Sequence, residues 1–149
     1  MAILKEEPQP TANGITLEEA HKVVMAARRK AEDIGVPMNI AVVDAGNNLT
    51  EFVRMDGAWL GSIDIAMSKA FTARAFDMTS AALGAAAQTG GPLFGIQAGN
   101  QGKIIIFGGG VPLQKDSRVV GAIGVSGGSV PQDIEVAEAG AHAFENLGK

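Results

Sequence analysis

The sequence predicts an α+β domain in which helices flank an antiparallel sheet of five strands. Three observations predict this class. The apolar residues follow helix-like and strand-like spacings in the order α, β, β, α, α, β, β, β, α. The links between most neighbouring strands are of hairpin length, which favours antiparallel pairing. Strands and helices do not alternate as they do in folds built on a parallel sheet.

The composition fits one domain and excludes several functional classes. The 149 residues carry 12 Lys and Arg against 16 Asp and Glu, a net charge of -4, which argues against a nucleic-acid or anionic-membrane partner. The chain has no Cys, which excludes disulfides, thiolate nucleophiles and thiolate-bound zinc. The N-terminus lacks the pattern of a secretory signal, and no apolar run is long enough to span a membrane, so we expect a cytoplasmic protein.

Two regions divide the chain. Residues 1–14 contain Pro8 and Pro10 without apolar periodicity and are predicted to form an N-terminal arm. Residues 15–149 are predicted to form a single domain. Its first helix begins at Thr16, because Thr16 and Glu19 have the spacing of a capping box, and it ends near Gly35.

Two strand-like runs follow, at residues 38–43 and 49–55. The residues between them, 44–48, are rich in Asp, Gly and Asn, which are typical of tight turns. We therefore expect an antiparallel hairpin. Because Asp44 ends the first strand and Arg54 ends the second, these two side chains mark opposite ends of that hairpin.

The second half of the domain begins with two helices and ends with one. Small apolar residues at helical spacing predict a helix from Ser62, and a shorter Ala-rich helix follows at residues 79–88. The last helix opens at Val130-Pro131 and ends before Gly148. Between these helices, short β-branched runs predict three further strands, at residues 103–107, 111–114 and 118–126.

Two glycine-rich segments are candidates for binding an anion through backbone amides. The triplet Gly108–Gly110 follows an apolar run, and Ser126 opens a glycine-rich turn before the last helix. The triplet lacks the Lys and Ser/Thr of a phosphate-binding loop. A sharp bend between strands explains the triplet equally, and helix capping explains the second segment.

Arg54 and Lys69 are the two cations that we expect near a pocket, because a bound carboxylate needs a fixed positive partner. Salt bridges to Asp44, Asp56 or Asp64 are the structural alternative. Lys69 is also a candidate Schiff-base nucleophile, a role that requires a desolvated site.

The two histidines, His21 and His142, lie on the first and the last predicted helix. Neither has the His or Cys partners at helical spacing that are typical of zinc sites. A single imidazole is sufficient as the axial ligand of haem, so His21 is a candidate iron ligand. A solvent-exposed histidine is the structural alternative for both.

Five segments together resemble the GlcG/HbpS family of haem-binding or haem-degrading proteins, which is also related to the C-terminal domain of PduO-type adenosyltransferases. They are NIAVVDAG at 39–46, RMDGA at 54–58, IDIA with KA and TA at 63–73, GGGVP at 108–112 and GAIGVSG at 121–127. The resemblance implies a profilin-like α/β/α sandwich with a five-stranded antiparallel sheet. It also implies homo-oligomers, from dimers to octamers.

The leading hypothesis from this resemblance is a cytoplasmic haem-binding protein that degrades or senses haem, with His21 on the iron and Arg54 or Lys69 on a propionate. A second hypothesis is an enzyme of small-carboxylate catabolism, and a third is a structural or ligand-sensing oligomer. The predicted site residues are Lys69 and Asp44 as catalytic groups, His21 as metal ligand, and Arg54, Asp56, Thr72, Gly108, Gly109, Gly110 and Ser126 as ligand contacts.

Overall fold

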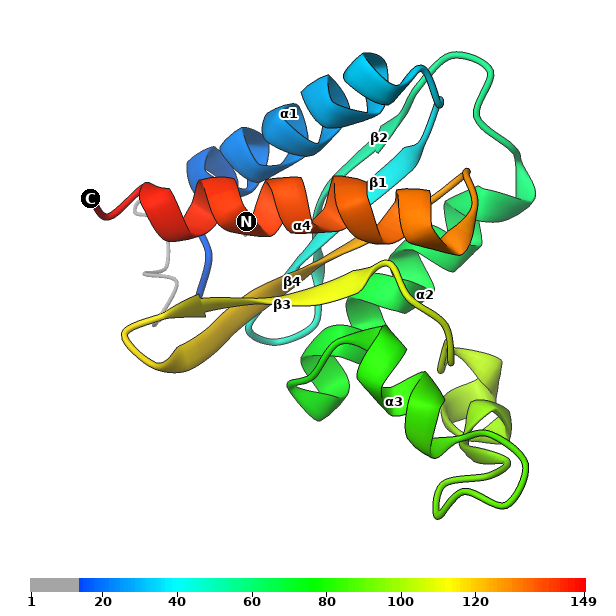
Figure 1. Ribbon diagram of the computed structural model, residues 1–149. Coiled ribbons are helices and arrows are strands. Elements are labelled where there is room, and N and C mark those ends of the chain that lie inside the picture. Colours follow the sequence, from blue (N-terminus) through cyan, green and yellow to red (C-terminus); the bar gives the residue numbers. More distant parts are fainter. Residues whose placement is uncertain (1–13) are drawn as a thin grey trace, which may run out of the picture.

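The computed structural model describes residues 14–149, so nearly all of the predicted arm lies outside the described residues. An antiparallel sheet is formed by β1 (Asn39–Asp44), β2 (Leu49–Arg54), β3 (Gly110–Lys115) and β4 (Arg118–Ser126). The longer helices are α1 (Leu17–Ile34), α2 (Gly61–Phe76), α3 (Ser80–Ala86) and α4 (Val130–Asn146), and two short 3-10 helices, Ile96–Ala98 and Asn100–Gly102, precede β3 (Figure 1).

The strands are arranged in the order β2-β1-β4-β3, with every neighbouring pair antiparallel. The predicted hairpin between β1 and β2 is confirmed, with Asn39 opposite Arg54. Asn39 also lies opposite Ser126 of β4, so Arg54, Asn39 and Ser126 form a row across one end of the sheet. Asp44 lies at the other end, opposite Gly121.

Helices cover both faces of the sheet (Figure 1). Helices α1 and α4 share one apolar core with Ile40, Val42 and Ile123, whereas α2 packs on the opposite face through Ala66, Ala70 and Ala73. A Cβ atom at Gly124 would lie 2.1 Å from the Ala66 carbonyl oxygen, so this glycine lets α2 approach the backbone of β4 directly.

The described sheet has four strands, not the predicted five, because residues 103–107 do not pair with a strand. Helices take the place of a partner strand there. The Ile105 amide donates to the Thr72 hydroxyl of α2 at 2.9 Å. A Cβ atom at Gly84 of α3 would lie only 1.9 Å from the Ile106 carbonyl oxygen. Ile104 is buried and Ile105 and Ile106 are partly buried, so this run is covered without a partner strand.

The ends of α1 and α4 follow from local sequence. Thr16 and Glu19 form the predicted capping box of α1, and Gly35 ends the helix in the left-handed conformation. Ser129 and Gln132 form a second capping box, which starts α4 immediately before Pro131 and Asp133. The N-terminal end of α4 is thereby fixed beside the last residues of β4.

Candidate functional site

Lys69 lies fully buried between the layers of the fold. It leaves α2 beside the end of β4, where its ammonium donates to Asp133 Oδ2 at 2.7 Å and to the Val125 carbonyl at 2.9 Å. Gly128 donates its amide to the other oxygen of Asp133 at 2.9 Å. The Phe107 ring closes the space, with its centroid 5.0 Å from the ammonium.

Burial lowers the pKa of the Lys69 ammonium below the usual range of a lysine, whereas the hydrogen bond and the charge of Asp133 act in the opposite direction. The paired carboxylate favours the charged ammonium even though water is excluded. The pair joins α2 to α4 across the end of β4. We infer a structural role for these two side chains from this arrangement.

The glycine triplet lies against Lys69. A Cβ atom at Gly109 would lie 2.7 Å from the ammonium, and one at Gly110 would lie 2.4 Å from the Lys69 carbonyl oxygen. The Gly110 amide donates to the Ser80 hydroxyl at 2.8 Å, and the Gly109 carbonyl accepts from Val125 at 2.9 Å. These contacts are those of a sharp bend, which the sequence allowed as the alternative to an anion-binding role for the triplet.

Gly108 also packs closely, since a Cβ atom there would lie 2.4 Å from the side chain of Ile134 on α4. All three glycines of the triplet are buried. The triplet and Lys69 thus lie together, as the sequence hypotheses required. However, the contacts that the described residues make around Lys69 and the triplet are all with other protein groups.

Arg54 lies apart from Lys69. Its guanidinium donates to the Ala58 carbonyl oxygen from Nη2 at 3.1 Å and from Nε at 3.3 Å. Arg54 and the buried Ser126 are separated by β1, so their backbones lie roughly 10 Å apart at the usual spacing of strands. The structure therefore places Arg54 and Ser126 at the same end of the sheet without direct contact.

The remaining predicted residues are dispersed. Asp56 is exposed in the turn after β2. Thr72 donates to the Ser68 carbonyl at 2.7 Å and receives the Ile105 amide, so its hydroxyl supports residues 103–107. Asp44 accepts the Asn48 amide at 2.9 Å in the hairpin turn. Since β1 is six residues long, Asp44 lies about 17 Å from the end of the sheet that contacts Lys69.

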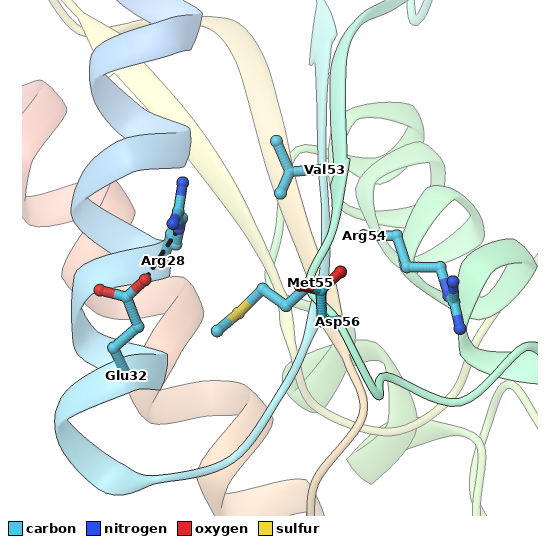
Figure 2. Close-up of a pocket in the computed structure, with 6 residues that line it drawn as sticks. All are labelled: Arg28, Glu32, Val53, Arg54, Met55 and Asp56. Carbon is cyan, nitrogen blue, oxygen red and sulfur yellow. Dashed lines mark hydrogen bonds and ion pairs between the residues drawn. The ribbon is translucent and has the colours of Figure 1, made fainter.

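Outside this packed region, a surface groove of about 400 Å³ lies beside β2 and is lined by Arg28, Glu32, Val53, Arg54, Met55 and Asp56 (Figure 2). Val53 packs toward the core under α1, whereas Phe52 packs toward α2, as alternating residues of a strand do. Figure 2 shows Arg54 extending away from Arg28 and Glu32. Arg28 and Arg54 therefore serve opposite faces of the sheet.

His21 lies on the same side of the sheet as Arg28. Its Nδ1 atom is 2.8 Å from Oε1 of Glu51 on β2. The His21 side chain is 61% exposed and that of Glu51 is 18% exposed. The second histidine, His142, lies 4.0 Å from Glu145, and its side chain is 75% exposed.

Apolar and cationic side chains surround His21. Leu17 and Met25 lie one turn before and one turn after it on α1, and Leu17 is 64% exposed. Leu49 lies on the α2 face of the sheet, because the register of β2 shifts between Leu49 and Glu51. Arg28 follows two turns after His21 and contacts Glu32 at 2.8 Å. We call this surface the His21 face; its residues are Leu17, His21, Met25, Arg28 and Glu51.

The His21 face was only partly foreseen from the sequence. His21 was a candidate, but Glu51 and Arg28 were not. Within residues 14–149, no group of three or more His, Asp or Glu side chains is placed to hold a metal ion jointly. An exposed imidazole with one free nitrogen fits the alternative donor arrangement, in which a porphyrin supplies the other ligands of iron.

No helix of the described chain is long and apolar enough to cross a membrane.

Comparison with known proteins gives a consistent result. Residues 15–142 match the family model described as haem degrading protein HbpS-like. A 15.0 kDa protein of Citrobacter freundii is 43% identical over 89% of this chain and 94% of its own length. The corrinoid adenosyltransferase PduO of the same organism is 38% identical over 92% of this chain, which spans only 41% of that enzyme.

Two solved structures share the fold closely. The ORFY protein of Klebsiella pneumoniae is 38% identical, with a TM-score of 0.89 over 98% of this chain and 99% of its own. The PduOC structure, solved as a complex with haem, is 35% identical, with a TM-score of 0.84 over 87% of this chain and 94% of its own.

Proposed function

This chain belongs to the HbpS-like family, and on that premise we propose that it binds haem on the His21 face with His21 as the iron ligand. The observation that carries the proposal is the structure of PduOC in complex with haem. PduOC matches most of this chain at 35% identity. Haem supplies a redox-active iron when bound. The protein supplies an axial ligand, an apolar surface for the porphyrin and a cation for the propionates.

The His21 imidazole has the arrangement that supports such a ligand. One ring nitrogen, Nδ1, contacts Glu51, and the largely exposed side chain leaves Nε2 as the nitrogen for iron. Iron-ligating histidines commonly have this arrangement, in which the second ring nitrogen contacts a carboxylate. The exposed Leu17 side chain offers apolar area beside it.

We propose Arg28 as the partner of a propionate. Arg28 lies seven residues after His21 on the same helix, about 10 Å along its axis. Its present partner, Glu32, is half exposed, and such surface ion pairs are worth only about 0–1 kcal/mol. Arg28 can therefore leave Glu32 and pair with a propionate at a small cost in free energy. The two cations predicted from the sequence are less suitable: Lys69 is paired with Asp133 in the interior, and Arg54 extends to the other face of the sheet.

Hemin titration of the purified protein tests this proposal. We expect a defined Soret band at stoichiometric hemin, loss of its axial-ligand signature in His21→Ala, and a several-fold weaker affinity in Arg28→Ala. Arg74→Ala is the matched control, because it removes an equal charge from α2 on the opposite face of the sheet, outside the groove, and should leave the affinity unchanged. A wild-type spectrum identical to that of free hemin would overturn haem binding. Weaker affinity in Arg54→Ala alone would reassign the propionate.

Self-association belongs to the same proposal. Trp59 and Leu60 before α2 and Phe94 before β3 are each about two-thirds exposed or more. Exposed aromatic and aliphatic groups of this size commonly mark interfaces between subunits. Light scattering of the purified protein measures the number of chains in the assembly.

A further inference from the structure

The carboxylate of Glu51 has a single evident partner. Among residues 14–149, His21 is the one group that contacts this carboxylate by a hydrogen bond or ion pair. The second oxygen, Oε2, is buried and has no hydrogen-bond partner within this part of the chain. A largely buried carboxylate whose partner is the ring of an exposed histidine is well placed to control that ring.

We propose that Glu51 is a positioning residue that fixes the tautomer and the orientation of the His21 imidazole, so that Nε2 is presented outward as a ligand. The inference rests on the proposed haem function and adds a second residue to that site. Glu51 does not touch the ligand. It acts through His21.

The chemistry of a neutral imidazole shows which ring nitrogen of His21 carries the proton. Such a ring carries one N–H, and an ionised carboxylate can only accept hydrogen bonds. At 2.8 Å from Glu51, Nδ1 therefore carries the proton and donates it, which leaves the lone pair on Nε2. The remaining lone pair is on the nitrogen that faces away from β2.

Glu51 is anchored by the pairing of its strand. Glu51 lies within β2, paired opposite Val42 of the central strand β1. Val53, two residues later on the same face, is packed into the core beneath α1. Because the strand fixes the carboxylate and α1 fixes the Cα atom of His21, the hydrogen bond between them selects one orientation of the ring.

His142 provides an internal reference. It is exposed, and its nearest carboxylate is 4.0 Å away on the same helix, beyond hydrogen-bond distance. The chain contains no other histidine, so two imidazoles account for all histidine signals. A difference between them reports the effect of Glu51.

The first measurement needs no haem. In ¹⁵N-labelled protein at a pH where both rings are neutral, long-range ¹H–¹⁵N spectra identify the protonated nitrogen of each imidazole. We expect His21 as the Nδ1–H tautomer and His142 as the Nε2–H tautomer of a free ring. In Glu51→Ala we expect the His21 signals to move to the His142 pattern. A wild-type His21 in the Nε2–H form, or an unchanged tautomer in Glu51→Ala, would overturn the proposal.

The second measurement uses hemin. Loss of the residue that orients a metal ligand typically weakens metal affinity by about 10–100-fold, and we expect a loss of that size in Glu51→Gln and Glu51→Ala. A carboxylate on Nδ1–H also makes the ring a stronger donor to ferric iron, so both variants should show a more positive midpoint potential. Unchanged affinity and potential would overturn the role of Glu51 toward haem.

The two failures are distinguishable. If the wild-type tautomers and their response to Glu51→Ala are as expected but hemin does not bind, the proposed function is overturned and not the control of His21 by Glu51. Circular dichroism of each variant confirms that the fold is retained. Glu145→Gln, which changes the carboxylate nearest to the reference His142, is the matched control and should leave the His21 tautomer and the affinity unchanged.

Discussion

Two side-chain pairs of nearly equal length occupy very different regions of this molecule. Lys69 and Asp133 meet at 2.7 Å beneath the end of β4, with side chains that are 0% and 4% exposed. His21 and Glu51 meet at 2.8 Å on the outside of α1 and β2, with side chains that are 61% and 18% exposed. Distance alone does not separate them.

Unused bonding capacity does separate them. The Lys69 ammonium also bonds to the Val125 carbonyl, and both oxygens of Asp133 accept hydrogen bonds. Those atoms have little capacity left for a ligand. In the other pair, one ring nitrogen remains open to the solvent side. The lysine, whose residue type indicates reactivity, therefore has a structural setting, whereas the less conspicuous histidine has the open nitrogen on which our proposal of a ligand rests.

The largest effect should come from leaving the buried ammonium without its partner. We expect Asp133→Ala to lower the free energy of unfolding by about 3–5 kcal/mol, because Lys69 then carries an uncompensated charge in the interior. Urea denaturation monitored by circular dichroism measures this difference.

Two further variants test the reason for that loss. The double variant Lys69→Met with Asp133→Leu removes both charges and should recover much of the stability. Glu138→Ala removes an exposed acid from the same helix and should change stability by less than about 0.5 kcal/mol. A loss in Asp133→Ala as small as that in Glu138→Ala would contradict the buried pair.

A smaller effect is expected where the backbone packs against the buried pair. A Cβ atom at Gly110 would lie 2.4 Å from the Lys69 carbonyl oxygen, so we expect Gly110→Ala to cost about 1–3 kcal/mol through forced displacement. Thermal and urea unfolding measure this loss. Gly61 has no neighbour within 4 Å of its built Cβ atom, so Gly61→Ala should be nearly neutral. Equal effects at both positions would contradict the close approach.

The smallest change in stability is expected at the outer pair. Because His21 is largely exposed and Glu51→Gln keeps the shape of the side chain, we expect a loss of only about 0.2–1 kcal/mol and a slight shift of the urea midpoint. Under the proposed function, the same substitution weakens haem binding strongly. A loss of stability comparable to that of Asp133→Ala would place Glu51 among the groups that hold the fold together.

Local signals accounted for much of the fold. The capping box of Thr16 and Glu19 lies within four residues, and the turn between β1 and β2 lies within five, so neighbouring residues specify both features. The run at residues 103–107 misled the prediction because β-branched content indicates burial in an extended segment and not the presence of a partner strand. The Thr72 hydroxyl supplies the bond that a strand was expected to supply.

The site was less accessible to sequence reasoning, because its contacts join distant segments. Asp133 lies 64 residues from Lys69, and Glu51 lies 30 residues from His21. No spacing rule covers such separations. One signal was present for Glu51: it alternates with Val53 and Met55, which face the core, and an acidic residue at such a position is unusual and indicates a specific partner.

The strand order has a consequence for how the protein is made. Strand β1 lies between β2 and β4, and α1 shares its core with α4. During translation, β1 and α1 leave the ribosome long before β4 and α4 are synthesised. A nascent chain that stalls before Arg118 displays uncovered apolar surface and an unpaired strand edge, the features by which chaperones and aggregation partners recognise incomplete chains.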